Sequence, residues 1–568
     1  MDTVGESNFL ILREDIWMSL PPSSSYSVPE QTQRVARAAF PKNTLCLRLA
    51  DEFGTIFQDQ DFADLFPSQG QPAEAPFRLA LVTVLQFLEG LSDRAAADAV
   101  RSRIDWKYLL CLELDDAGFD YSVLCEFRAR LLNGGAEHRL FDRILSLLQQ
   151  RQWVKARGRQ RTDSTHVIAA VRDLNRLERV IETLRAALNA LAATAPAWVQ
   201  TNIPAEWVDR YGKRAEEHDL PSGEKQRQAL AEQVGCDGDA LLVALWSTEA
   251  PTWMRALPAI ETLRQVWVHS FLSTFEGLRW RSKDNVPPSG LRICSPYDTE
   301  ARYAHKRSTT WVGYKVHLTE TCEQDLPSLI TQVQTTEAIQ NDNEALPEIH
   351  QELFEAALLP SKHLVDAGYV DAMQLLESGR QYGVELIGPA QGNGRWQHEQ
   401  DNGFDISHFI IDWDKQQATC PEGKTSSSWK ARADGRGHQL IGVAFAKAEC
   451  SQCPSLTLCT QSKTKRRTLN LKPQPLYEAL QQNRQQKKTK EFQREYRQRA
   501  GIEGTISQGV RAFGLRKARY LGMAKTRLQH LATAAAMNLE RLADWLAGVD
   551  RETTRRSIFT RVMRPRTA

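Results

Sequence analysis

The sequence is poor in cysteine, has no long apolar run and carries little net charge. Ten cysteines are spread over 568 residues, too few for a disulfide framework, so any cluster among them is expected to bind metal. No stretch approaches the ~20 consecutive apolar residues of a transmembrane helix. The N-terminal residues lack the basic-then-apolar order of a secretory signal. We therefore expect a cytoplasmic protein with no membrane partner.

The overall composition is that of a folded protein. A hydrophobic fraction of 42% and a charged fraction of 25% exclude a wholly disordered or collagen-like chain. At roughly 100 to 200 residues per domain, the length predicts several domains with buried cores.

The near-neutral total hides an asymmetry along the chain. From Gln461 to the C-terminus there are 25 Lys and Arg against 8 Asp and Glu, whereas residues 1–460 carry 47 against 62. A basic, mostly helical C-terminal region predicts a polyanionic partner, with a merely solvated charged face as the alternative.

Apolar periodicity predicts an α/β fold for the centre of the chain. The segments TDSTHVIAAV (162–171), WVGYKVHLTE (311–320) and SLITQVQTTEA (328–338) have strand patterns, and the last two predict a hairpin. Helical patterns follow at about 343–359 and 372–382. Alternating strands and helices indicate a mixed sheet covered by helices.

Other segments have different sequence patterns, and these patterns predict the domain boundaries. Leucines spaced by three and four residues over 174–191 predict a packed helix that begins an insertion. Residues 391–470 are rich in Gly, Asp and Cys and are expected to be irregular. The expected division is an N-terminal extension (1–75), a helical DNA-binding domain (76–150), a core (155–173 and 290–390), a helical insertion (174–289), a Cys-rich insertion (391–470), C-terminal helices (475–548) and a basic tail (549–568).

Four basic residues lie on or near the second predicted helix of the 76–150 region. Such a helix can face DNA, or its charges can form a solvated face. The residues are Arg94, Arg101, Arg103 and Lys107.

Three acidic residues, far apart in the sequence, are the candidates for catalysis. Asp163 begins one predicted strand and Asp366 ends another, and either alone is typical of a turn. The third, Glu503, belongs to the pattern Tyr496-x2-Arg499-x3-Glu503. On a helix, this spacing places Arg499 and Glu503 one turn apart on the same face.

At these residues the sequence resembles the DDE transposases of bacterial insertion sequences, in the branch with a tyrosine, arginine, glutamate signature. The resemblance covers most of the chain, including the segment SPYDTEARYAHKRSTTWVGYKVHLTET and the LVDAGY around Asp366. It implies an RNase H-like catalytic core for 155–173 and 290–390, with Asp163, Asp366 and Glu503 as catalytic metal ligands. The family commonly has a lysine seven residues after the glutamate. Here that position is Val510, and the adjacent Arg511 can bind phosphate instead.

The chemistry expected of such a site agrees with this resemblance. Mg²⁺, or Mn²⁺ in its place, takes a few carboxylates and keeps positions for water and phosphate oxygens. Two ions roughly 4 Å apart can activate the attacking oxygen and stabilise the leaving oxygen of a phosphodiester. The competing interpretation of Arg499 and Glu503 is a plain one-turn ion pair.

A second constellation has the spacing C-x29-C-x2-C-x5-C. The C-x2-C pair suits tetrahedral Zn²⁺, with unliganded thiols as the alternative and His438 as a competing ligand. The four residues are Cys420, Cys450, Cys453 and Cys459. The other six cysteines are expected to be buried or inert.

These features together predict a transposase that binds double-stranded DNA at its element ends and target, and that cleaves and rejoins strands with divalent metal. A homodimer on DNA and a nucleoid-associated location are implied by the resemblance. The expected DNA-binding residues are Tyr496, Arg499, Arg511, Arg516, Lys517 and Arg519.

Two other functions remain open at the level of sequence. One is a recombinase with a covalent intermediate on Tyr496 or Ser164. The other is a non-catalytic, domesticated DNA-binding regulator, in which the acids are incidental.

Overall fold

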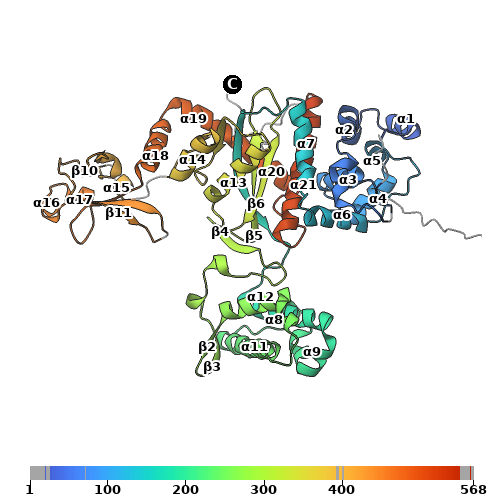
Figure 1. Cartoon of the computed structure of the whole chain (residues 1–568), viewed down its shortest axis with the longest axis horizontal. Helices are drawn as coiled ribbons and strands as arrows, with labels where there is room; N and C mark the ends of the chain where they lie inside the picture. Colours follow the sequence, from blue (N-terminus) through green and yellow to red (C-terminus); the bar gives the residue numbers. More distant parts are fainter. Residues whose placement is uncertain are drawn as a thin grey trace, which may run out of the picture.

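The computed structural model describes residue 20, residues 26–70, 72–391, 396–399, 402–435 and 437–549, and residues 559 and 563. Most of the expected basic tail, 549–568, therefore lies outside the described residues. Figure 1 shows a central sheet with an N-terminal helical region on one side, a Cys-rich region on the other and a helical insertion beyond the end of the sheet. Among the described helices, none is both long enough and apolar enough to span a bilayer.

The central sheet is mixed, and β1 lies in its middle. β1 pairs antiparallel with β5 and parallel with β7, β7 pairs parallel with β8, and β4 and β6 pair antiparallel with successive halves of β5. The predicted hairpin is confirmed as β5 and β6, whereas β4 was not predicted. The strands are β1 (Arg159–Ile168), β4 (Arg302–Lys306), β5 (Thr309–Thr321), β6 (Ile330–Glu337), β7 (Lys362–Val365) and β8 (Glu385–Ile387).

Helices cover both faces of this sheet, which confirms the mixed α/β expectation. Alternate residues of β6 show the two faces: Gln332 bonds to Glu352 of α13, whereas Thr335 bonds to His530 of α21. α20 also packs on β1 and β5. The covering helices are α13 (Asp342–Glu355), α14 (Ala372–Tyr382), α20 (Gly501–Ala512) and α21 (Met523–Leu546).

The N-terminal helices share one continuous hydrophobic core with the sheet. Buried residues from Cys46 to Leu148 pack in the same cluster as Val167, Val333 and Leu539, and α21 contacts α3 and α7. The elements are α1 (Glu30–Ala39), α2 (Leu45–Phe53), η1 (Asp59–Leu65), α3 (Pro76–Glu89), α4 (Asp93–Ser102), α5 (Ile104–Leu109), α6 (Ser122–Asn133) and α7 (Arg139–Gln150).

Two of the four basic residues expected on an exposed helix face are engaged inside this region. Lys107 is buried and donates to the backbone carbonyls of Glu113 and Asp116. Arg103 pairs with Glu89 and Asp105. Lys107 therefore cannot belong to a DNA-facing or solvated surface, whereas Arg94 and Arg101 are exposed.

The insertion between β1 and β4 has a hydrophobic core of its own, which contains Trp207 and Trp267. The expectation of an entirely helical insertion was wrong at its end, where β2 and β3 form an antiparallel hairpin. The elements are α8 (Arg176–Thr194), α9 (Pro196–Asn202), α10 (Trp207–Tyr211), η2 (Ala215–Glu217), α11 (Glu224–Leu245), η3 (Thr252–Ala256), α12 (Pro258–Ser270), β2 (Phe271–Thr274), β3 (Gly277–Trp280), η4 (Lys283–Asn285) and η5 (Ser289–Leu291).

Gly238 of α11 packs closely against Trp267 of α12. A Cβ at this position would lie 2.1 Å from a ring carbon of Trp267, so Gly238→Ala forces the indole out of its packed position. We expect the change to lower the free energy of unfolding of the insertion by about 1–3 kcal/mol, measured by urea denaturation followed by tryptophan fluorescence. Gly379→Ala in α14 is the control, because no atom lies within 4 Å of its added Cβ. Equal effects of the two changes would contradict the packing argument.

The Cys-rich region contains strands, so the expectation of an irregular segment was wrong. β11, β12 and β13 form a three-stranded sheet, and β9 and β10 pair separately. The elements from 396 onward are α15 (Trp396–Glu399), η6 (Ile406–His408), β9 (Ile410–Asp412), β10 (Gln417–Thr419), β11 (Ser428–Ala433), β12 (Gln439–Ala444), α16 (Lys447–Ser451), α17 (Leu456–Cys459), β13 (Thr468–Leu471), α18 (Gln474–Gln486), α19 (Lys490–Tyr496) and η7 (Arg497–Ala500).

Candidate active site

The sheet brings Asp163 and Asp366 onto neighbouring strands. β1 and β7 are parallel, and Thr162 lies opposite Val365. Asp163 and Asp366 are the next residues along these two strands. They therefore lie side by side, although 203 positions separate them in the sequence. The carboxylate of Asp366 accepts a hydrogen bond from the backbone N–H of Gly368 at 2.8 Å, which holds it at the mouth of the loop after β7.

Glu503 reaches the same place from the first turn of α20. Arg499, in η7, lies between the acids: its Nη1 is 3.3 Å from Asp163 Oδ2 and its Nη2 is 3.2 Å from Glu503 Oε1. The expected one-turn relation between Arg499 and Glu503 is present, although a 3₁₀ turn interrupts the helix there. One guanidinium thus bridges two of the three predicted acids.

The acids differ in how far they are exposed. Only 16% of the Asp163 side chain is exposed, against 64% of Glu503. Burial raises the pKa of Asp163 to about 6, with the charge of Asp366 adding to the rise and Arg499 opposing it. A carboxyl in this environment favours a bound cation, because a nearby positive charge offsets the cost of burying a negative one.

The pKa of Tyr496 is affected by all three acids. Burial raises its pKa, and the carboxylates of Asp366, Asp163 and Glu503 raise it further, while Arg499 lowers it. All three acids therefore lie within electrostatic range of one phenol. Within the described ranges of the chain, however, no group of three or more His, Cys, Asp or Glu side chains forms a preassembled metal cage.

A fourth acid, Asp342, was missed from the sequence because it begins α13 in a context typical of helix capping. Ser164 Oγ donates to Asp342 Oδ1 at 3.2 Å, and Lys315 Nζ lies 3.2 Å from the same oxygen. A Cβ on Gly368 would lie 3.0 Å from both Asp342 Oδ2 and Asp366 Oδ1. The glycine therefore lets two carboxylates approach one loop from opposite sides.

Two segments of the chain match known protein families. Residues 419–543, which include Glu503, match the family described as "Transposase DDE domain", and residues 34–130 match "Transposase domain (DUF772)". These two matches support an insertion-sequence DDE transposase. No curated protein and no solved structure matches this transposase. The two matched segments flank the part of the sheet that carries Asp163 and Asp366.

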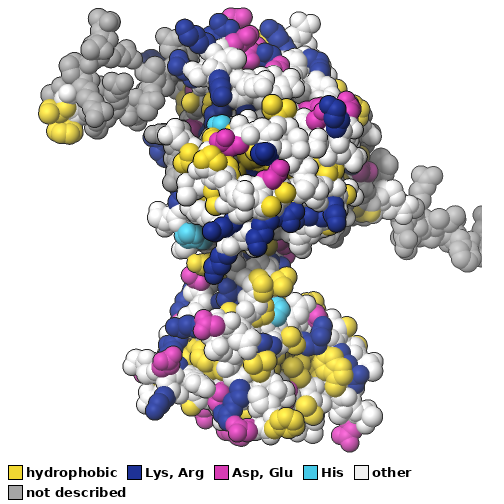
Figure 2. All heavy atoms as spheres, turned by 90° about the vertical axis from the view of Figure 1, so that its left-hand side faces the viewer, with side chains coloured by type: hydrophobic (Ala, Val, Ile, Leu, Met, Phe, Trp, Pro, Cys, Tyr) yellow, Lys and Arg dark blue, Asp and Glu magenta, His cyan; other side chains and the backbone are white. Residues whose placement is uncertain are grey.

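The basic residues expected to bind DNA in this transposase have different surroundings. Arg516 donates to Thr165 Oγ1 at 2.7 Å, on the strand that carries Asp163. Arg511 and Lys517 are exposed. Arg519 instead donates to the carbonyl of Leu91 at 2.9 Å, which ties it to the N-terminal helices. Figure 2 shows Lys and Arg side chains gathered in a band across the middle of one face, above the narrowing of the molecule.

The four clustered cysteines of the transposase line one cavity of about 40 Å³. Burial raises the pKa of Cys459 to about 11, and its neighbours Cys450, Cys453 and Cys420 add to the rise. The backbone N–H of Lys424 donates to Cys420 Sγ at 3.3 Å. His438, the alternative ligand, is not among the residues lining this cavity and instead lies 2.9 Å from Asp434. Of the other six cysteines, Cys125 and Cys236 are exposed.

Proposed function

We propose that this transposase binds the terminal inverted repeats of its element and catalyses metal-dependent strand cleavage and strand transfer, with Asp163, Asp366 and Glu503 as metal ligands. The observation that carries the proposal is that Asp163 and Asp366 follow paired residues of two parallel strands, while Arg499 contacts both Asp163 and Glu503. Neighbouring carboxylates repel one another, so a bound cation would stabilise this group.

The residues present fit a divalent ion in the form of Mg²⁺ or Mn²⁺. Asp163 and Asp366 provide hard oxygen donors at adjacent strand positions, and Glu503 is exposed enough to turn toward them. When bound, the metal supplies charge for the phosphate oxygens at the reacting bond. Arg499 now holds two carboxylates, and its planar fork can turn to a phosphate of the incoming DNA.

We also infer that the central sheet is an RNase H-like core. Its strand order runs β6-β5-β1-β7-β8, with β1 antiparallel to β5 and parallel to β7. The two aspartates lie on the central strand and directly after its parallel neighbour. The region 76–150 would then serve DNA binding, and 174–289 and 391–470 would be insertions into that core.

The DNA partner and assembly follow from the same proposal. Arg511, Arg516 and Lys517 lie on the segments that lead away from Glu503, where the phosphates on either side of the cut would pass. Cleavage at two ends of one element calls for two active sites, so we propose a homodimer on nucleoid DNA.

The direct test is strand cleavage of the sequence that flanks the gene. Purified protein is incubated with an end-labelled fragment carrying that flank, with Mg²⁺, with Mn²⁺ or with EDTA. We expect a defined nick only with metal and no protein–DNA adduct on a denaturing gel. Cleavage in EDTA together with an adduct would favour a covalent recombinase acting through Tyr496 or Ser164. Binding without cleavage under every condition would favour a non-catalytic regulator.

We further propose a structural Zn²⁺ held by Cys420, Cys450, Cys453 and Cys459. Four thiols line one small cavity, and one of them accepts a hydrogen bond from a backbone N–H. They do not form a ready metal site among the described residues, so zinc would have to draw them together as a tetrahedral set of thiolates. Binding must displace thiol protons, so the site is expected to lose metal as pH falls.

Zinc content measures this proposal directly. Protein purified without chelator is expected to contain one equivalent of zinc by elemental analysis, and Cys453→Ser is expected to lower that content to near zero. Cys236→Ser is the control, because Cys236 is a cysteine of the separate helical insertion. Zinc-free wild-type protein that has the same melting temperature after zinc is added would refute the proposal.

A further inference from the structure

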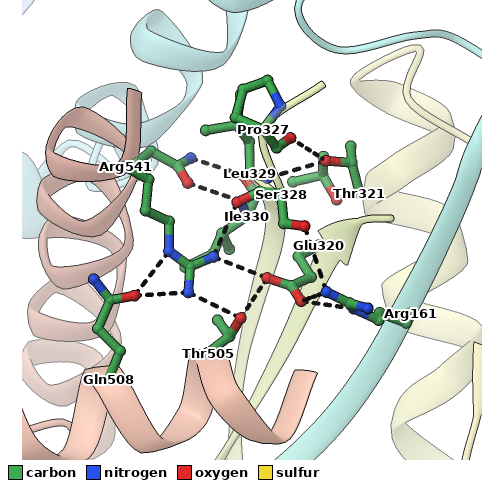
Figure 3. A network of polar contacts seen from close by, with 12 residues as sticks. Arg161, Glu320, Thr321, Pro327, Ser328, Leu329, Ile330, Thr505, Gln508 and Arg541 are labelled. Atoms are coloured by element: carbon green, nitrogen blue, oxygen red, sulfur yellow. Dashed lines mark hydrogen bonds and ion pairs between the residues drawn. The ribbon is translucent and has the colours of Figure 1, made fainter. Parts of the chain in front are cut away.

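A fully buried carboxylate, Glu320, lies at the centre of a polar network under α20. It is on β5, directly opposite Arg161 of β1 in the strand register. Figure 3 shows Glu320 between the guanidinium groups of Arg161 and Arg541, with Thr505 at its side. A charge buried this deeply is tolerated only when its oxygens are fully paired.

The pairing of Glu320 is complete. Arg161 lies 2.6 Å from Oε1 through Nη2 and donates to it at 2.7 Å through Nε. Oε2 accepts from Thr505 Oγ1 at 2.5 Å and from Arg541 Nη1 at 2.9 Å. Arg541 also bonds Gln508 of α20, so both sides of the network hold that helix.

The members of this network lie next to the predicted catalytic groups in sequence. Arg161 is two residues before Asp163, on the same face of β1. Thr505 is two residues after Glu503 in α20. Arg161 Nη1 donates to the carbonyl of Gln498 at 2.6 Å, immediately before Arg499. The hydrogen bonds of this network therefore hold residues that are close in sequence to Asp163, Glu503 and Arg499.

The start of α20 is packed directly on this network. A Cβ on Gly501 would lie 2.0 Å from Arg161 Nη1, so any side chain at this position would displace the guanidinium that Glu320 holds. The first residue of α20 therefore lies close to a guanidinium that Glu320 holds in place.

We propose that Glu320, Arg161, Thr505 and Arg541 are positioning residues that hold α20 at the height and rotation at which Glu503 meets Asp163 and Asp366. This inference rests on the proposed function. It goes further in stating that the metal affinity of the site depends on a buried network that touches neither metal nor DNA. Residues that orient metal ligands from behind typically change metal affinity by about 10- to 100-fold when replaced.

A half-buried ion pair elsewhere on the sheet provides a control. Glu352 of α13 pairs with Arg527 of α21 at 3.1 Å and accepts from Gln332 at 3.0 Å. It resembles the Glu320 network in chemistry and also holds α21, but none of these bonds reaches α20. Variants of both sites would lose stability if the effect is general. Only variants of the Glu320 network would misplace Glu503 and so change metal binding.

The test compares Thr505→Val, Thr505→Ser, Glu320→Gln and the control Glu352→Gln with the wild type. Valine keeps the shape of threonine and removes the hydroxyl that Glu320 accepts from, whereas serine keeps it. Mn²⁺ binding is followed by the loss of the free-ion electron paramagnetic resonance signal, and the Mg²⁺ concentration for half-maximal cleavage is measured in parallel. Melting temperatures show whether each variant is folded.

We expect Thr505→Val and Glu320→Gln to weaken Mn²⁺ binding and raise the Mg²⁺ requirement by about tenfold, with cleavage recovering at high metal concentration. Thr505→Ser and Glu352→Gln should match the wild type. Should Glu320→Gln fail to fold, Thr505→Val decides. Unchanged metal dependence in a folded Thr505→Val, or an equal change in Glu352→Gln, overturns the inference.

A Glu503→Gln variant in the same series separates the proposed catalytic role of Glu503 from the positioning role of the buried network. Loss of cleavage in Glu503→Gln with wild-type metal dependence in Thr505→Val removes the positioning role alone. Normal cleavage by Glu503→Gln removes the proposed role of Glu503, and the positioning inference with it.

Discussion

Asp163→Asn, Asp366→Asn and Glu503→Gln are each expected to lower metal-dependent strand cleavage by at least about 10³-fold. Each change keeps the size of the side chain and removes one anionic oxygen donor. A bound metal stabilises the charge that develops in the transition state by several kcal/mol. Each ~1.4 kcal/mol of lost stabilisation lowers the rate tenfold. The measurement is single-turnover cleavage of a labelled element end in Mg²⁺.

Binding to the element end should survive these changes, because phosphate contacts come from the basic residues. A gel-shift titration is therefore expected to give affinities within a few-fold of the wild type. Glu337→Gln is the control: Glu337 ends β6, pairs with Arg302 and belongs to none of the contacts around Arg499. Wild-type cleavage by any one of the three acid variants would remove that residue from the site.

Arg499→Ala is expected to lower cleavage by about 10²-fold, the scale for removing one preorganised charge donor from an active site. Its side chain is 13% exposed, and its guanidinium contacts both Asp163 and Glu503. Removing it takes away both the counter-charge and the fork that can donate to a phosphate. Arg499→Lys should fall between alanine and wild type, because it keeps the charge and loses the fork.

The neighbouring Arg497 provides the control for this change. It is an exposed residue of the same 3₁₀ turn, so Arg497→Ala changes the net charge equally without reaching the acids. Cleavage by Arg497→Ala is expected to stay near wild type. Equal losses in the two variants would show that general charge, and not the position of Arg499, accounts for the effect.

Much of the core could be predicted from local pattern. α14 has the bounds expected from its sequence, Ala372–Tyr382, because an aspartate cap precedes it and a left-handed glycine follows it. The hairpin of β5 and β6 was also predictable. The adjacency of Asp163 and Asp366 was not, since it depends on which strands pair across 203 residues of sequence.

The buried network was missed for a physical reason. Alternation in β5 predicted one polar face, but helices cover both sides of the sheet, so His317, Thr319 and Glu320 are buried along with their apolar neighbours. Polar residues inside a doubly covered strand are paired by partners that the sequence does not reveal. Glu320 is an example, since two of its partners, Thr505 and Arg541, lie 185 and 221 positions away.

The short strands of the Cys-rich region were missed for another reason. They are three to six residues long, too short for a clear alternation, and glycine and aspartate between them indicate loops. The hairpin of β2 and β3 likewise lies directly after the long helix α12, where the helical pattern of the insertion concealed it.

Anomalous diffraction from crystals soaked in Mn²⁺ tests the central claim most directly. We expect a peak bounded by carboxylate oxygens of Asp163 and Asp366, with Glu503 turned from Arg499 toward the ion. A well-occupied Mn²⁺ held by other residues, with these three carboxylates left unliganded at saturating metal, would contradict it.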